Sequence, residues 1–188
     1  MLFEEEIRNY QYVNRQEKSD QGVILDYIKD YKDNILTRDN KIAHLTSSGF
    51  IMNKALTKVL MIHHNIYNTW AWTGGHADGE ENLLEVAIKE AKEETGLNTV
   101  ELMSSEIASI DILPVTGHVK KDRYVSAHLH LNVAYLLLAN EEHSLLINER
   151  ETSGVKWVNI DEIADHSQEP ELIKIYNKLL NQAKKIET

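Results

Sequence analysis

The sequence predicts an α/β sandwich with an N-terminal helical extension. Five segments have the pattern of strands, and helical patterns lie before, between and after them. At 188 residues the chain has the length of one domain with a substantial core. We therefore expect a helical extension over residues 1–40 and one α/β domain over residues 41–188.

The N-terminal extension is expected to contain two helices, at residues 2–18 and 21–36. The second prediction rests on apolar side chains at roughly helical spacing. These side chains are Val23, Ile24, Tyr27, Ile28, Tyr31 and Ile35. A break near residues 37–40 separates the helices from the first strand, and the sequence assigns the two helices no role.

The sheet is expected to follow the extension. Its five strands are predicted at residues 44–52, 57–63, 107–114, 127–139 and 154–158. A helix rich in acidic residues lies between the second and third strands. The last helix, at residues 170–186, has a core-facing stripe that contains Leu172, Ile173, Ile175, Tyr176, Leu179 and Leu180.

The composition argues against several classes of protein. Thirty acidic and 20 basic side chains give a net charge of −10, which argues against nonspecific nucleic-acid binding. The chain has no cysteine, so disulfides and thiolate zinc sites are excluded and a cytoplasmic location is expected. No segment approaches the length of a membrane span, and residues 4–6 are acidic, unlike a signal peptide. We expect no membrane partner.

The acidic helix contains the most informative cluster of side chains. Glu90, Glu93 and Glu94 lie at i, i+3 and i+4 and therefore share one helix face. Two like charges about 6 Å apart cost roughly 0.7 kcal/mol in bulk water and roughly 3 kcal/mol at an effective dielectric constant of about 20. A solvated face tolerates the first cost, whereas a face in a cleft needs a cation. Oxygen ligands suit Mg²⁺, Mn²⁺ or Ca²⁺.

The two ends of this helix are also marked in the sequence. Asn82 is expected to be the N-cap, with Glu85 three residues later, and Gly96 is expected to be a left-handed C-cap. A mostly apolar stripe, rotated about 120° from the carboxylates, consists of Leu84, Ala87, Ile88, Ala91 and Thr95. One helix face is therefore expected to pack on the core while another presents carboxylates to a cleft.

Residues 75–97 combine glycines and glutamates at a characteristic spacing. Gly75 is followed by five residues, Glu81, seven residues and then Lys-Glu-Ala-Lys-Glu-Glu-Thr-Gly-Leu. This pattern resembles the Nudix box of the Nudix hydrolases. The match covers 23 contiguous positions and departs at Lys89, where the family has arginine. The preceding residues 70–75, Trp-Ala-Trp-Thr-Gly-Gly, are also similar to the family's approach to the box, although Thr73 stands where proline is common.

The resemblance implies a Nudix-type α/β/α sandwich with a mixed sheet and a metal-dependent catalytic site. Glu90, Glu93 and Glu94 are implied to bind Mg²⁺ or Mn²⁺, together with a backbone carbonyl at Gly74. Bound cations would also keep this acidic cluster from repelling the phosphates of a nucleotide substrate.

Other positions of the box are implied to be structural. These are Gly75, Gly96 and Glu81, and Glu81 is expected to pair with Lys89. Lysine keeps the charge of arginine but lacks the planar fork that holds two carboxylates, so Lys89 is expected to affect the rate of catalysis more than the fold.

The implied reaction is attack of water on a diphosphate linkage in a nucleoside diphosphate joined to another group. ADP-ribose, a nucleotide sugar, a dinucleotide and a nucleoside triphosphate are members of that class. The resemblance places a general base or further metal ligand in a late loop, with Glu151 as first candidate and Glu149 as second, and Glu90 is a third. The alternative is a Nudix-fold domain that senses a nucleotide without cleaving it, although a sensor does not need all three helix glutamates.

Histidines suggest contacts beyond the box. His128 and His130 alternate with leucines, so on a strand they share one face with Asn132. This face has three interpretations: a phosphate or nucleobase contact, a second metal site completed by His63 or His64, or a polar sheet face with hydrogen-bonded imidazoles. His76, inside the glycine loop, is expected either to contact phosphate or to shape the loop.

The polar segment at residues 117–124 is a further candidate. Its side chains Arg123 and Tyr124 are expected to bind the distal phosphate or sugar of the substrate, or to lie on a solvated loop. Trp70 and Trp72 are expected to pack in the core and not to stack on a nucleobase. The expected partner is a small nucleotide-type molecule, and a homodimer is left open.

Overall fold

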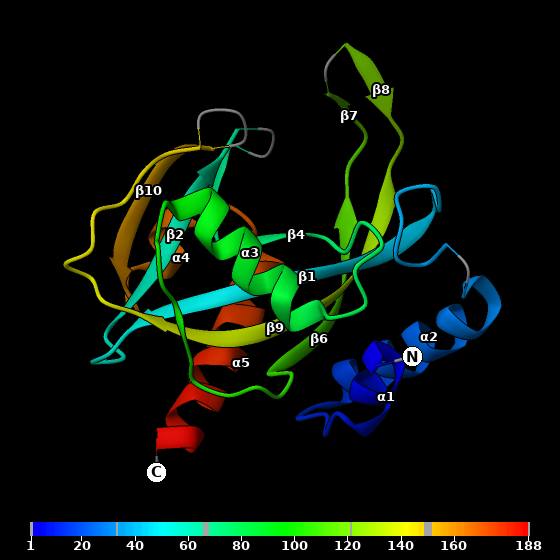
Figure 1. The fold of residues 1–188 in the computed structure, drawn as a ribbon, viewed down its shortest axis with the longest axis horizontal. Helices are drawn as coiled ribbons and strands as arrows, with labels where there is room; N and C mark the ends of the chain where they lie inside the picture. The colour runs from blue at the N-terminus through cyan, green and yellow to red at the C-terminus, as the bar shows by residue number, and fades with distance from the viewer. Residues whose placement is uncertain (1, 33, 66–67, 121, 149–151, 188) are drawn as a thin grey trace.

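A mixed sheet forms the centre of the fold in the computed structural model, which describes residues 2–32, 34–65, 68–120, 122–148 and 152–187 (Figure 1). Its strands are β1 (Ala43–Asn53), β2 (Lys58–His64), β3 (Thr69–Ala71), β4 (Thr73–His76), β5 (Glu101–Leu102), β6 (Ser109–Val115), β9 (His128–Ala139) and β10 (Thr152–Asn159). The order is β10-β2-β1-β9-β5, with β3 beside β2, β4 beside β1 and β6 beside β9. β1 and β9 are parallel, and the other pairs are antiparallel.

Helices cover both faces of this sheet, which confirms the α/β/α sandwich. The helices are α1 (Leu2–Asn9), α2 (Arg15–Tyr31), α3 (Leu83–Thr95), α4 (Ile163–His166) and α5 (Pro170–Glu187). α3 and α5 lie on opposite faces, and α1 and α2 lie beside the β6 end (Figure 1). A separate hairpin of β7 (His118–Lys120) and β8 (Arg123–Val125) extends from the sheet. None of the helices in the described ranges is both long and apolar enough to cross a membrane.

The five strands expected from the sequence are all present, as β1, β2, β6, β9 and β10. The short strands β3, β4, β5, β7 and β8 and the short helix α4 were not expected. β4 reads Thr-Gly-Gly-His, so it has no apolar alternation and exists because its backbone pairs with β1. The segment predicted as a loop at residues 117–124 is instead largely a hairpin, whose turn includes Asp122 with a φ of 59°.

The predicted boundaries of the N-terminal helices were wrong. The break lies at residues 10–14 and not near residue 19, and the second helix starts at Arg15 and ends at Tyr31. The Asn14 side chain accepts the Glu17 N–H at 2.9 Å, and Glu17 in turn accepts the Val13 N–H at 2.7 Å. This N-cap decides the boundary, and the apolar periodicity continued past it.

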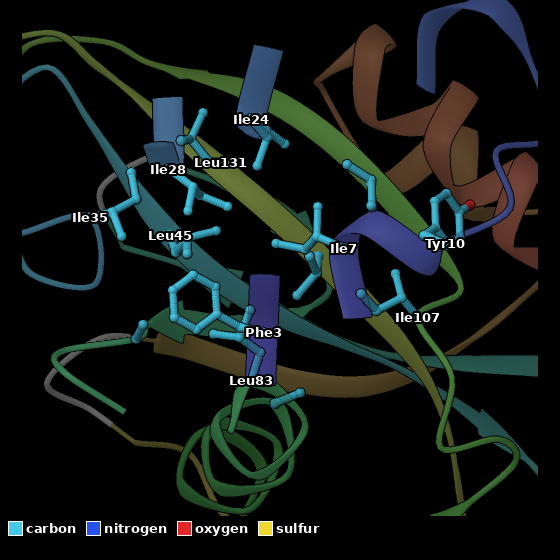
Figure 2. Close-up of a cluster of buried hydrophobic side chains, with 14 of the residues drawn as sticks. Phe3, Ile7, Tyr10, Ile24, Ile28, Ile35, Leu45, Leu83, Ile107 and Leu131 are labelled. Carbon is cyan, nitrogen blue, oxygen red and sulfur yellow. The ribbon is translucent and has the colours of Figure 1, made fainter. Parts of the chain in front are cut away.

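Both N-terminal helices pack on the sheet through one apolar cluster. Figure 2 shows Phe3 and Ile7 of α1 and Ile24 of α2 pointing toward Leu45 of β1 and Leu131 of β9. All five side chains are buried, so α1 and α2 share the core of the sheet. A domain boundary near residue 40 stays a prediction from the sequence.

Alternate residues of the central strands face opposite helices. Leu45 and Ile51 of β1 belong to the clusters on the side of α2 and α3, whereas Phe50 packs against Tyr176 of α5, with ring centroids 5.7 Å apart. Trp72 also packs edge-on against Tyr176, at 5.5 Å, as its core-packing interpretation expected. The even-numbered side chains at the start of β1 therefore lie on the face opposite α3.

A buried ionic network joins three elements. The Lys178 ammonium of α5 lies 2.7 Å from both a Glu17 carboxylate oxygen of α2 and an Asp111 carboxylate oxygen of β6. The Tyr10 hydroxyl donates to Glu17 at 2.8 Å, and the Ser109 hydroxyl donates to Asp111. Burial raises the pKa of Asp111, and the charge of Lys178 opposes that shift. The positive charge of Lys178 therefore offsets the negative charges of two buried carboxylates.

Replacing Lys178 with Met is expected to lower the free energy of unfolding by about 3–5 kcal/mol, because the change leaves Glu17 and Asp111 buried without their cation. Chemical denaturation near pH 7 measures the change. Lys174→Met is the matched control on an exposed position of the same helix and is expected to change the value by less than about 0.5 kcal/mol. Equal stability of the two variants would contradict the role of the network.

Candidate functional site

The glutamates lie on α3, whose predicted caps are confirmed. The Asn82 side chain accepts the Glu85 N–H at 3.2 Å, and Gly96 has a φ of 74° while its N–H donates to the Lys92 carbonyl at 2.9 Å. A Cβ at residue 96 would also lie 2.5 Å from the Cβ of Leu146, so two constraints favour glycine there. Both ends of the carboxylate-bearing helix are therefore held.

Packing of α3 brings the carboxylates to the edge of the core. Leu83, Ala87 and Ala91 are completely buried against the sheet. Glu90 is partly buried, and Glu94, one turn further, is only 3% exposed. Glu90 and Glu94 therefore do not lie on a fully solvated face, and repulsion between their charges costs more than it would in bulk water.

The glycine strand β4 packs directly on these carboxylates. The Gly74 N–H donates to a carboxylate oxygen of Glu94 at 3.0 Å. A Cβ at Gly75 would lie 2.4 Å from the Glu90 carboxyl carbon and 2.6 Å from one of its oxygens. Gly74 lies as close to Ser48 on the other side of β4. The two glycines therefore let the backbone of β4 approach both α3 and β1, which no larger residue permits.

Glu93 has a different environment from its two neighbours. Its side chain is 54% exposed and lies 3.9 Å from the Lys89 ammonium, one turn earlier on α3. Lys89 and Glu81 form no ion pair within the described residues, so their expected pairing stays a prediction. Glu81 precedes the N-cap and is exposed, whereas Glu93 lies four residues after Lys89 on the same helix face.

Two of the predicted catalytic residues, Glu149 and Glu151, lie outside the described residues. Of the three candidates for the general base, only Glu90 is described, and its carboxylate lies against the backbone of Gly75.

Four histidines gather on the opposite face of the sheet. His44 of β1, His76 of β4, and His128 and His130 of β9 each present a ring nitrogen, and these atoms all lie within 4.8 Å of one another. His44 pairs with His130 across the parallel strands, and Thr46, the next residue on that face, pairs with His76. The register in which β1 pairs with β4 and β9 therefore brings the four histidine rings together.

Hydrogen bonds orient two of these rings. The Nδ1 of His44 donates to the Asn40 carbonyl at 3.0 Å, and the Nδ1 of His128 donates to the Ser126 carbonyl at 2.9 Å. Because a carbonyl only accepts, Nδ1 carries a proton in both rings, and in a neutral ring Nε2 then has the lone pair. The Nε2 atoms of His44 and His130 are buried and have no hydrogen-bond partner.

Burial keeps two of the rings neutral. Loss of solvent and, to a smaller extent, the charges of the neighbouring histidines lower the pKa of His130 to about 2. The pKa of His44 is also lowered, chiefly by burial. At neutral pH these two imidazoles are therefore uncharged.

The sequence anticipated only part of this cluster. It placed His128 and His130 on one face but proposed His63 or His64 as their partners. His63 lies instead on β2, where its Nδ1 is 2.7 Å from the Ser153 hydroxyl and its ring packs edge-on against Trp70. His44 was missed, because only the pairing of β1 with β9 reveals that it faces His130.

A polar network continues the same sheet face. The Asn132 side-chain oxygen accepts hydrogen bonds from Thr46 at 2.9 Å and from Ser48 at 3.0 Å. All three side chains are buried. The polar strip thus runs from the histidines to Ser48, which lies beneath Gly74.

The predicted substrate contacts Arg123 and Tyr124 lie on the hairpin of β7 and β8. Both are exposed, and Tyr124 packs its hydroxyl over Gly117. Neither forms a hydrogen bond or ion pair with the α3 glutamates in the part of the chain that the structure describes. Their role in substrate binding stays a prediction.

Comparison with known proteins agrees with this geometry. The family model of the NUDIX domain matches residues 43–179. A Xenopus laevis protein named m7GpppN-mRNA hydrolase NUDT17 is 35% identical over 111 residues, which are 54% of this chain and 35% of that protein. The asymmetrical bis(5'-nucleosyl)-tetraphosphatase of Rattus norvegicus is 29% identical over 112 residues, which are 59% of this chain and 66% of that protein. The chain therefore spans only part of each curated relative.

Solved structures agree on the fold. The E. coli dihydroneopterin triphosphate pyrophosphohydrolase superimposes with a TM-score of 0.55 at 14% identity, over 73% of this chain and 94% of that chain. At this identity the likeness concerns the fold alone. Since the family model spans well over half of the sequence, including the glycine strand and α3, the chain belongs to the Nudix hydrolase family.

Proposed function

We propose that this protein is a divalent-metal-dependent pyrophosphohydrolase that cleaves a diphosphate linkage in a nucleotide-type substrate. The main observation that supports this proposal is the packing of Gly74 against Glu94 and of Gly75 against Glu90. This contact joins a flat, side-chain-free backbone to carboxylates at the edge of the core. A sensor that did not cleave its ligand would not need these carboxylates.

The residues present fit the divalent cation that the family implies. Glu90, Glu93 and Glu94 supply only oxygen donors, the type that Mg²⁺ and Mn²⁺ prefer, and the Gly74 carbonyl is the proposed fourth donor. Glu93 is half-exposed, so one side of the cluster is open to solvent. When bound, the cation would offset the carboxylate charge, polarise the phosphoryl group and lower the pKa of a bound water.

The chain's own groups position that reaction. Gly74 holds one oxygen of Glu94, so the carboxylate has a defined orientation before substrate arrives. Glu90, partly buried beside Gly75, is the described candidate that accepts the proton of the attacking water. Glu151, followed by Glu149, remains the proposed base or further metal ligand from the late loop.

We propose dinucleoside polyphosphates as the leading substrate class. Both curated relatives are named for compounds in which phosphates join one nucleoside to another nucleotide unit. The net charge of −10 disfavours long polyanions, so a small dinucleotide fits this chain better than a capped RNA. ADP-ribose, nucleotide sugars and nucleoside triphosphates are the other members of the proposed class. A cytoplasmic location stays a prediction from the sequence, and a homodimer stays open.

Replacing Glu93 and Glu94 together with Gln is expected to lower kcat/KM by at least ~10²-fold, because the change removes two of three metal-binding charges. Glutamine keeps an oxygen that can accept the Gly74 N–H, so the fold is expected to persist. Steady-state kinetics with Mg²⁺ and Mn²⁺ measure the loss. Glu85→Gln, at an exposed position in the first turn of the same helix, is the control and is expected to retain activity.

Two results together would contradict the metal-dependent mechanism. One is unchanged turnover in the double variant, and the other is wild-type activity that persists in EDTA. Mg²⁺-dependent binding of a nucleotide without any hydrolysis would instead favour the sensing domain.

Gly75→Ala is expected to lower kcat/KM by about 10²-fold, because the new methyl group must displace the Glu90 carboxyl group by about 1 Å. The dependence of rate on Mg²⁺ concentration is expected to shift to higher concentrations. Gly22→Ala is the matched control, since a Cβ there has no atom within 4 Å and lies in a helix. It is expected to leave activity intact and to raise stability by roughly 0.5–1 kcal/mol. Equal activity of both alanine variants would show that the close approach at Gly75 is dispensable.

A substrate panel tests the proposed class. Diadenosine tetraphosphate and the cap dinucleotide m7GpppG are expected to give the highest kcat/KM, ahead of ADP-ribose, nucleotide sugars and nucleoside triphosphates. A capped RNA of about 20 nucleotides is expected to be cleaved at least ~10-fold less efficiently than m7GpppG at low salt, because repulsion grows with substrate charge. Chromatographic detection of the nucleotide products measures each rate. Faster cleavage of the capped RNA would refute this substrate assignment without refuting the metal chemistry.

A further inference from the structure

The four histidines on the face of β4 opposite α3 form a cluster that the proposed hydrolysis does not use. Along β4, Gly75 lies against Glu90 of α3, and the next residue, His76, points to the other face. Three strands supply the rings: β1, β4 and β9. The group contains no carboxylate, so its chemistry differs from that of the glutamate site.

We infer that His44, His76, His128 and His130 form a binding site for Zn²⁺. Four imidazole nitrogens are a suitable ligand set for zinc and a poor one for Mg²⁺, which prefers oxygen. The ring nitrogens lie within 4.8 Å of one another, and a tetrahedral zinc site with bonds of about 2.1 Å places its nitrogens roughly 3.4 Å apart. Modest ring rotations therefore close the site.

The hydrogen bonds of the outer ring nitrogens match those of metal ligands. A zinc-bound histidine usually donates its second N–H to a carbonyl or carboxylate, which orients the ring. His44 does so to the Asn40 carbonyl, and His128 does so to the Ser126 carbonyl. Because Nδ1 is used in this way, the Nε2 atom of each neutral ring is left to bind a cation.

Two buried nitrogen atoms lack any other partner. The Nε2 atoms of His44 and His130 are buried and have no hydrogen-bond partner among the described residues, and His44 as a whole is only 4% exposed. Buried polar atoms are nearly always paired, so two orphaned atoms in one cluster point to a ligand. Burial also keeps both rings neutral, which is the form that binds metal.

An anion is a poorer occupant of the cluster. Phosphate needs hydrogen-bond donors, but the Nδ1–H groups of His44 and His128 are already used by backbone carbonyls. When both rings are neutral, their remaining nitrogens would face phosphate oxygens as acceptor against acceptor. The cation therefore fits better than the phosphate contact that His128 and His130 first suggested.

Four protein ligands would complete the coordination of zinc, as in structural sites. The ion would join β4 to β1 and β9 directly behind the glycines that pack on α3. We assign it a structural role in holding β4, separate from the catalytic cation.

Zinc binding by the untagged protein tests this site. Calorimetric titration with ZnCl₂, in excess Mg²⁺ to occupy the glutamates, is expected to give one ion per chain with a Kd below about 1 µM. At zinc concentrations about 100-fold above that Kd, the thermal midpoint is expected to rise by roughly 5–10 °C. Co²⁺ is expected to give the visible absorption of a tetrahedral nitrogen site.

Single variants separate the cluster from other histidines. His128→Asn and His76→Gln, both at partly buried rings, are expected to weaken zinc binding by at least about 100-fold. His63→Gln changes a partly buried histidine on β2 outside the cluster and is expected to retain zinc affinity. Circular dichroism confirms that each variant is folded.

Three results of the zinc titrations would overturn the assignment, and so would one result with phosphate. The zinc results are the absence of zinc binding tighter than about 100 µM, full zinc affinity in both folded cluster variants, and equal loss of affinity in His63→Gln. Binding of orthophosphate that His128→Asn abolishes would identify an anion site and would also overturn it. Because the readout is zinc affinity and not hydrolysis, this test is independent of the proposed activity.

Discussion

The parallel pairing of β1 with β9 is the constraint on which the rest of the structure depends. It joins residues 43–53 to residues 129–139 in one continuous register. Strand residues alternate between faces, so this register assigns one set of side chains to α2 and α3 and the other to α5. A shift of one residue would send His44 to the side of the apolar core and Leu45 to the polar strip. Such a pairing is well specified because both faces are buried.

β4 connects this sheet to the two candidate sites. It pairs with β1, and it has glycine at the two positions where backbone must approach Ser48 and Glu90. The next residue, His76, completes the histidine cluster on the other face. A short strand without apolar side chains therefore links the carboxylates of α3 to the histidines of β1 and β9. Its position depends on contacts on both of its faces, which explains why its composition is so restricted.

The two proposed sites lie on opposite faces of the sheet and have different donor atoms. The α3 side offers carboxylate oxygens, of which only those of Glu93 are largely exposed, whereas the opposite side offers neutral imidazoles of His44 and His130 with buried Nε2 atoms. Oxygen and nitrogen ligands select different cations, so the two sites need not compete for one metal. Lys89 belongs to the first site, where its exposed contact with Glu93 is long and weak.

The sequence by itself determined the features that depend on local spacing. The caps of α3, the common face of Glu90, Glu93 and Glu94, and the five long strands follow from periods of 3.6 and 2 residues. The Asn14 cap that marks the break after α1 is also local, but the apolar periodicity around it favoured a different boundary. The tertiary structure decided the short strand β4, which pairs with β1 and packs on α3. It also decided the histidine cluster, because His44 and His130 meet only through strand pairing across 86 residues of chain. Periodicity tells which face a side chain occupies, and only the register between strands tells which side chain lies next to it.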